Sequence, residues 1–111
     1  MEKRKIYLCG QIAGMSMKSA KVKFDAAQKY FNEMGMICCN PCRQFSLESW
    51  EDNLIRDLML IKRCDAICLL DGWAKSDESR IEKIFSERIG KEILYFDGKE
   101  ITTSFKNYVK S

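Results

Sequence analysis

The chain has 111 residues, 46% of them hydrophobic and 32% charged, with a net charge of +3. This length fits one domain, residues 1–111, and the apolar content argues against disorder. Its apolar runs are far shorter than the roughly 20 residues that span a bilayer, and we expect a soluble cytoplasmic protein with no membrane partner. The basic residues are scattered without interleaved aromatic residues, so we also expect no nucleic-acid partner.

The cysteine and histidine content restricts the chemistry. The sequence has six cysteines and no histidine, which excludes Ser-His and Cys-His dyads. Cys39 and Cys42 have the C-x-x-C spacing of a redox pair or half of a zinc site, but nothing supplies a second half. We therefore expect no metal and no organic cofactor, so that catalysis would depend on carboxylates, Tyr, Lys or thiols.

The first half of the chain predicts two strands around one helix. Residues 5–9 form a short apolar run closed by Gly10, and residues 36–39 form another, ended by Asn40-Pro41. Between them, Ser16 is suited to cap a helix that stops at Gly35. The apolar stripe of that helix consists of Ala20, Phe24, Ala27, Phe31 and Met34.

The second half repeats this alternation. Ser49 begins a helix whose apolar face carries Trp50, Leu54, Leu58 and Ile61. Residues 66–70 predict a third strand, ended by Asp71-Gly72. Ser76 or Asp77 then caps a third helix that runs to about Ile89, and residues 92–96 predict a fourth strand.

The tail after Asp97 allows two interpretations. Asp97-Gly98 can turn a hairpin into a strand at residues 101–103. Alternatively, Phe105, Tyr108 and Val109 mark a short final helix, which is the interpretation we favour.

Strands that alternate with helices predict βαβ units and a parallel sheet covered on both faces. We expect an α/β fold with three α/β/α layers, a flavodoxin-like doubly wound sheet of four to five strands. Ligands in such sheets bind beyond the carboxyl ends of the strands, here after Cys9, Cys39, Leu70 and Phe96.

Two carboxylates interrupt the apolar faces of their helices. Glu82 lies three residues before Phe85, and Asp57 lies three residues after Leu54. A carboxylate in such a position must be paired, hydrogen-bonded or functional. One interpretation is a rim position that meets an arginine such as Arg56 or Arg80. The other is a pair of carboxyl groups that acts on a glycosidic bond.

Four stretches carry a resemblance to a known family. They are residues 6–14 (Ile-Tyr-Leu-Cys-Gly-Gln-Ile-Ala-Gly), Asn40-Pro41, Asp57 with residues 64–67, and Gly72-Trp73 with Ser76 and Glu82. In this order and spacing, over about residues 5–95, the chain resembles the nucleoside 2-deoxyribosyltransferase-like proteins, closest to their short bacterial and phage branch. Related proteins include the 2′-deoxynucleoside 5′-phosphate N-hydrolases.

The resemblance implies roles for particular residues. Glu82 matches the glutamate nucleophile that attacks C1′ of a 2′-deoxyribose, and Asp57 matches an aspartate that positions the sugar or assists departure of the base. Tyr7 matches an aromatic hydroxyl beside the nucleophile. Gly10 and Gln11 match the loop that lines the sugar pocket. The implied substrate is a deoxynucleoside or its 5′-monophosphate, and the implied reaction is deoxyribosyl transfer or hydrolysis.

The segment before Glu82 follows the family pattern only in part. Ser76 matches a phosphate-binding serine of the N-hydrolases, which favours a 5′-phosphate or hydrolysis. Gly72 and Trp73 belong to the same substrate-binding stretch, in which Trp73 either stacks on a base or covers the sheet edge. Glu78 and Ser79 stand where the family usually has two small residues, and Glu78 adds bulk and negative charge there.

Two further hypotheses remain open from the sequence. In one, the chain is a non-catalytic module that binds a nucleotide-like ligand in the same crevice. In the other, Glu78 and the acidic segment 47–82 dock a basic partner. The resemblance also implies a homo-oligomer, for which Phe105 and Tyr108 would supply an interface.

Overall fold

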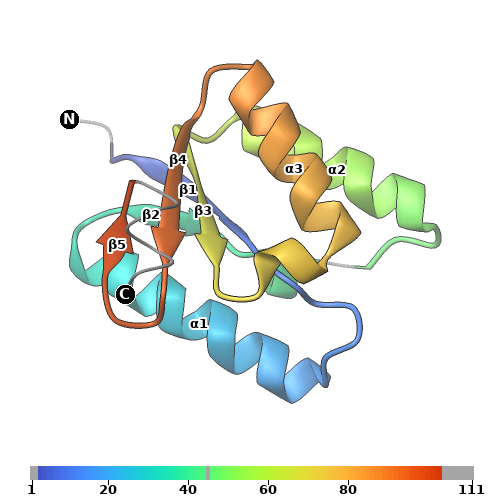
Figure 1. Ribbon diagram of the computed structural model, residues 1–111, viewed down its shortest axis with the longest axis horizontal. Coiled ribbons are helices and arrows are strands. Elements are labelled where there is room, and N and C mark those ends of the chain that lie inside the picture. Colours follow the sequence, from blue (N-terminus) through green and yellow to red (C-terminus); the bar gives the residue numbers. More distant parts are fainter. Residues whose placement is uncertain (1–2, 45, 104–111) are drawn as a thin grey trace.

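The computed structural model describes residues 3–44 and 46–103, in one five-stranded sheet with three α-helices (Figure 1). The strands are β1 (Lys5–Cys9), β2 (Ile37–Cys39), β3 (Ala66–Leu70), β4 (Glu92–Phe96) and β5 (Ile101–Thr102). The helices are α1 (Met17–Glu33), α2 (Trp50–Lys62) and α3 (Asp77–Arg88), with two 3-10 turns, η1 (Pro41–Arg43) and η2 (Trp73–Lys75).

The strand order confirms the predicted flavodoxin-like sheet. The strands lie in the order β2-β1-β3-β4-β5, parallel except for the antiparallel pair of β4 and β5. The chain leaves β1 toward β2 on one side, and β3 lies on the other side of β1. Winding therefore reverses between β1 and β3, and the crevice beyond their carboxyl ends is where such sheets bind ligands.

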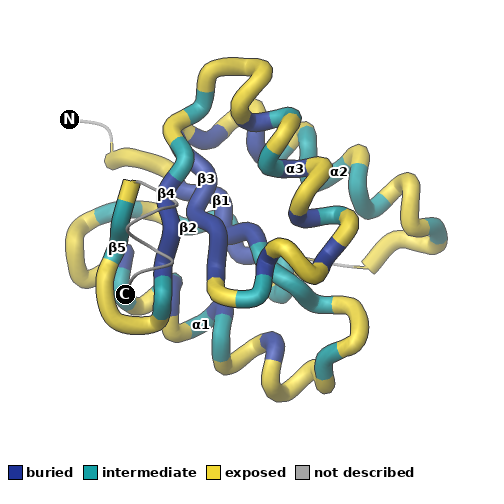
Figure 2. The backbone as a smooth tube through the Cα atoms, viewed as in Figure 1, coloured by how far each residue is buried: buried dark blue, intermediate teal, exposed yellow. Residues whose placement is uncertain are grey.

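The sheet separates two apolar layers, with α1 on one face and α2 and α3 on the other (Figure 1). Successive residues of a strand point to opposite faces, so Ile6 and Leu8 of β1 pack with α1. Tyr7 and Cys9 face the layer of α2 and α3. The central strands are dark blue in Figure 2, whereas the outward surfaces of the helices are exposed.

Serine caps place the three helices as the sequence predicted. The hydroxyls of Ser16, Ser49 and Ser76 accept hydrogen bonds from backbone amides three residues further on. Such a cap satisfies an amide that the helix cannot pair internally. The same caps fix where α2 and α3 begin, and these two helix starts border the crevice.

Two residues of the predicted apolar stripes are largely exposed. Met34 is 52% exposed because it is the C-cap of α1 and lies past the last buried turn. Trp50 is 48% exposed because it occupies the first position of α2, beyond the part that covers the sheet.

The hairpin interpretation of the tail is confirmed for residues 97–102. Thr102 pairs with Tyr95 and Ile101 with Phe96, which adds β5 to the edge of the sheet. The predicted final helix, with Phe105 and Tyr108, lies outside the described residues. Within the described ranges, no helix is both long and apolar enough to cross a membrane.

Candidate functional site

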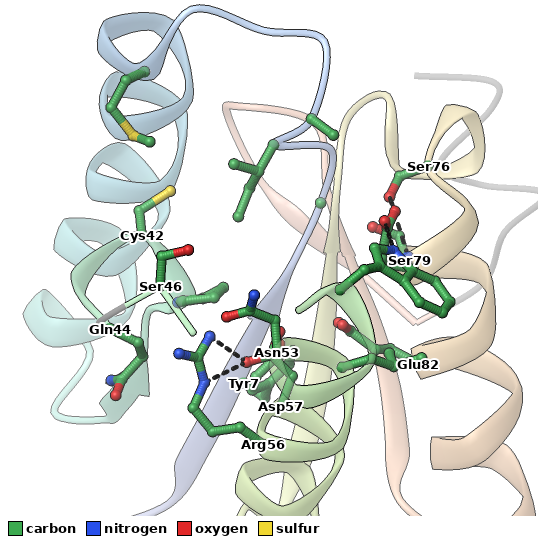
Figure 3. Close-up of a pocket in the computed structure, with 18 residues that line it drawn as sticks. Tyr7, Cys42, Gln44, Ser46, Asn53, Arg56, Asp57, Ser76, Ser79 and Glu82 are labelled. Atoms are coloured by element: carbon green, nitrogen blue, oxygen red, sulfur yellow. Dashed lines mark hydrogen bonds and ion pairs between the residues drawn. The ribbon is translucent and has the colours of Figure 1, made fainter. Parts of the chain in front are cut away.

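A pocket of about 350 Å³ opens at the winding reversal of the sheet (Figure 3). Its walls come from the loop after β1, from η1, from the first half of α2 and from the start of α3. Five of the eight residues proposed for the site line this pocket: Tyr7, Gly10, Asp57, Ser76 and Glu82.

Glu82 is the most buried carboxyl group of the pocket. Its side chain extends from α3 toward Tyr7 and Asp57 (Figure 3), and the residue is only 5% exposed. Burial, together with the nearby charge of Asp57, raises the pKa of Glu82 to about 8, although hydrogen bonds from Cys9 and Tyr7 oppose the shift. A carboxyl with this pKa changes its ionisation near neutral pH, as catalytic groups often do.

Tyr7 links the two carboxyl groups. It lies on β1, is fully buried, and interacts through its hydroxyl with both Glu82 and Asp57. Burial and the two neighbouring carboxyl groups raise the pKa of Tyr7 well above its usual value. The hydroxyl therefore keeps its proton at neutral pH and acts as a hydrogen-bond donor.

Asp57 enters the pocket from α2 and is paired with its neighbour. The guanidinium of Arg56 donates two hydrogen bonds to Asp57 Oδ1, at 3.2 Å from Nε and 3.0 Å from Nη2. Burial raises the pKa of Asp57, while the bonds and charge of Arg56 and a hydrogen bond from Tyr7 oppose this rise. The predicted pairing with an arginine is thus formed by Arg56, whereas Arg80 pairs with Asp77.

Cys9 is a part of the site that sequence reasoning missed. From the sequence it was only the last residue of the first strand, yet its Sγ lies 3.7 Å from the carbonyl oxygen of Ser79 and it hydrogen-bonds Glu82. Burial and the charge of Glu82 raise the pKa of this thiol well above its usual value. Its position two residues after Tyr7, on the same face of β1, was the available signal.

Glu78 holds together the start of α3 and the start of α2. Its carboxylate accepts hydrogen bonds from the indole nitrogen of Trp50 and from the hydroxyl of Ser76, the latter at 3.1 Å. Burial alone would raise the pKa of Glu78, but its own backbone amide, Trp50 and Ser76 outweigh that effect, so the pKa is lowered. Glu78 and Trp50 both line the pocket, and the role of Trp50 was not predicted.

The loop after β1 approaches β3 and α1 closely at Gly10. A Cβ atom at Gly10 would lie 3.2 Å from Cβ of Leu70 and 3.3 Å from Cζ of Phe24. A side chain at this position would require these neighbours to shift by a few tenths of an ångström. Gly10 allows the loop to reach the pocket wall while the core beneath it stays packed.

Three of the proposed residues do not line the pocket. Gln11 donates a hydrogen bond to its own loop, at 3.1 Å to the carbonyl oxygen of Ala13. Gly72 forms the left-handed turn after β3, with φ of +86°. Trp73 packs beside Tyr95 in the core layer of α2 and α3, with the two ring centroids 6.4 Å apart. Trp73 thus covers the sheet.

The C-x-x-C cysteines pack against different sides of the sheet. Cys39 contacts the core layer of α2 and α3, whereas Cys42 contacts the layer of α1. Cys39 instead shares a hydrogen bond with Cys64. Within residues 3–44 and 46–103, no group of three or more His, Cys, Asp or Glu side chains is arranged to hold a metal ion.

Comparison with known proteins identifies the family. Residues 4–95 match the family described as Domain of unknown function (DUF4406), and the chain belongs to that family. The match includes every described residue that lines the pocket and excludes β5. No curated protein matches the chain.

Proposed function

We propose that this protein is an enzyme that cleaves the N-glycosidic bond of a 2′-deoxynucleoside or its 5′-monophosphate, with Glu82 as the nucleophile. The supporting observation is the burial of the Glu82 carboxyl group in a pocket beside Tyr7 and Asp57. Enzymes that cleave glycosidic bonds usually use two carboxyl groups whose different surroundings give them different pKa values. The resemblance to the nucleoside 2-deoxyribosyltransferase-like proteins supports the choice of sugar.

The proposed reaction has two steps at C1′. In the first step, the ionised carboxylate of Glu82 forms a bond to C1′, the C1′–N bond breaks, and the base leaves with the electron pair and takes a proton from solvent. In the second step, water or a second base attacks C1′ and the ester bond breaks. This step restores the carboxylate and returns one proton to solvent, so each turnover is balanced.

Tyr7 and Asp57 have supporting roles in this proposal. The Tyr7 hydroxyl donates to Glu82 and favours its ionised form, which is the reactive form. Asp57, fixed by Arg56, accepts a hydrogen bond from a sugar hydroxyl and positions the ring. Its negative charge also stabilises the positive charge that develops at C1′.

A chromatographic assay of base release tests the proposal. Each of the four common 2′-deoxynucleosides and its 5′-monophosphate is incubated with the wild type, with Glu82→Gln and with Glu87→Gln. Glu87 is the matched control because it lies on the same helix, is exposed, and pairs with Lys83 at 3.1 Å. We expect base release by the wild type and Glu87→Gln only. Equal release by Glu82→Gln would refute the role of Glu82.

One observation favours a second candidate, a non-catalytic module that binds a nucleoside-like ligand. The pKa of Glu82, raised to about 8 by burial and the charge of Asp57, leaves this group mostly protonated at pH 7. A protonated carboxyl donates a hydrogen bond and is not a nucleophile. Tight binding of a deoxynucleoside without base release at any pH from 6 to about 10 would favour this alternative.

A further inference from the structure

The start of α3 is a place where an anion would ordinarily bind, because its first amides lack partners within the helix. In this chain two of these amides already have local partners. The backbone amide of Ser79 donates to Ser76 Oγ at 3.2 Å, and the amide of Glu78 donates to its own carboxylate. The helix start therefore contains its own anion, the carboxylate of Glu78.

Two side chains also hold the carboxylate of Glu78 in place. Trp50 Nε1, on α2 across the pocket, donates to Oε1, and the hydroxyl of Ser76, the N-cap of α3, donates to Oε2 at 3.1 Å. Both Ser76 and Trp50 line the pocket together with Glu78. The hydroxyl of Ser76, which a phosphate would otherwise use, is thus engaged with a carboxylate.

The remaining charges of the pocket do not compensate for Glu78. Of the described residues that line it, Asp57, Glu78 and Glu82 carry carboxyl groups, and Arg56 carries the positive charge. The guanidinium of Arg56 is paired with Asp57 Oδ1 at 3.0 Å. A phosphomonoester would enter this pocket against a fixed negative charge and would lose its hydration shell.

From these contacts we infer that Glu78 is a specificity-determining residue that excludes phosphomonoesters, so that the pocket accepts nucleosides with a free 5′-hydroxyl. This inference rests on the proposed function for the identity of the sugar and base, and it selects one of the two substrate classes left open there. A 5′-hydroxyl is neutral and can donate a hydrogen bond to the carboxylate of Glu78. The Glu78 carboxylate thus takes the place that a substrate phosphate would occupy.

The test compares binding of each deoxynucleoside and its 5′-monophosphate by isothermal titration calorimetry. The proteins are the wild type, Glu78→Gln and Asp77→Asn. Glutamine keeps an oxygen acceptor for Trp50 while it removes the charge. Asp77 is the matched control because its side chain begins the same helix, is 77% exposed, and pairs with Arg80 outside the pocket lining.

We expect the wild type and Asp77→Asn to bind nucleosides more tightly than monophosphates. In Glu78→Gln the ratio of the two affinities should move toward the monophosphate by about tenfold or more, as expected when a nearby like charge is removed. An unchanged ratio, wild-type preference for monophosphates, an equal change in Asp77→Asn, or no binding by any of the proteins would overturn the inference.

Base release, measured in parallel, separates this inference from the proposed function. Binding that responds to Glu78→Gln without base release by any protein would support the inference and refute the catalytic proposal. Base release by the wild type, with an affinity ratio that Glu78→Gln leaves unchanged, would support the catalytic proposal and refute the inference about Glu78.

Discussion

The carboxyl group of Glu82 on α3 shares a hydrogen bond with the hydroxyl of Tyr7 on β1, and both residues are almost completely removed from solvent. Their elements are separated by some seventy residues, so the contact exists only in the folded chain. It has an electrostatic consequence, since the hydroxyl stabilises the ionised carboxylate that burial and the charge of Asp57 disfavour. The pH dependence of activity should follow from this balance.

The first prediction concerns the pH profile of the wild type. Because Glu82 must be ionised to attack C1′ and its pKa is raised to about 8 by burial and Asp57, about one tenth of the free enzyme is reactive at pH 7. We expect kcat/KM for base release to rise from pH 6 through about pH 8, where half of Glu82 is ionised, and to level off above about pH 9. A value of kcat/KM that falls through pH 8 would instead assign Glu82 as a proton donor.

The second prediction concerns Tyr7→Phe. This substitution removes the hydroxyl and keeps the ring, so the sheet should remain folded while the pKa of Glu82 rises further. We expect the rise of the pH profile to move to higher pH, with activity at pH 7 lower by about tenfold. The matched control is Tyr95→Phe, on the same face of the sheet but outside the pocket lining. A profile that stays in place in Tyr7→Phe would separate Tyr7 from the ionisation of Glu82.

The third prediction concerns stability. The folded-state pKa of Glu82, about 8, lies above its unfolded value. Between these two values the folded state binds more protons than the unfolded state, so the contribution of Glu82 to stability falls as pH rises through this window. The glutamine side chain in Glu82→Gln cannot ionise, so the stability of this variant should not fall as pH rises through the window.

Thermal unfolding at several pH values measures this effect. We expect Glu82→Gln to have a higher Tm than the wild type at pH 8 and above, and the difference to shrink toward zero near pH 4. Glu87→Gln, which alters an exposed ion pair, should show no such pH-dependent gain. A gain that is the same at every pH would mean that ionisation of Glu82 is not its cause.

The fourth prediction concerns the close packing at Gly10. Gly10→Ala would place a Cβ atom 3.2 Å from Leu70 and 3.3 Å from Phe24, and both neighbours belong to the buried core. We expect the free energy of unfolding to fall by about 1 to 3 kcal/mol, measured by urea denaturation. Unchanged stability would show that the loop can move away from the core without cost.

The fold was predictable because its signals are local. The spacing of Ala20, Phe24, Ala27 and Phe31 and the three capping serines specify where the helices lie, and short apolar runs specify the strands. Among the five strands, β5 was predicted less well. Ile101 and Thr102 form a two-residue strand whose pairing depends on β4, and a strand that short has almost no signal of its own.

The site was only partly predictable. Glu82 and Asp57 were found because a carboxylate on an apolar helix face conflicts with its surroundings. Trp50 was missed as a pocket residue, and Cys9 was missed as a hydrogen-bond partner of Glu82. Both roles depend on contacts with residues of α3 that form only in the folded chain. Trp73 was proposed as a site residue but packs in the core. No sequence pattern shows whether an aromatic ring points to the pocket or to the core.

The most direct test of the central claim is to identify the residue that carries the sugar. The protein is incubated at pH 8 with a 2′-fluoro-2′-deoxynucleoside, whose fluorine slows hydrolysis of a glycosyl ester, and is then digested and mapped by mass spectrometry. We predict a glycosyl adduct on the peptide that contains Glu82 in the wild type, and none in Glu82→Gln. An adduct on another residue, or base release with no adduct at all, would contradict the assignment of Glu82 as the nucleophile.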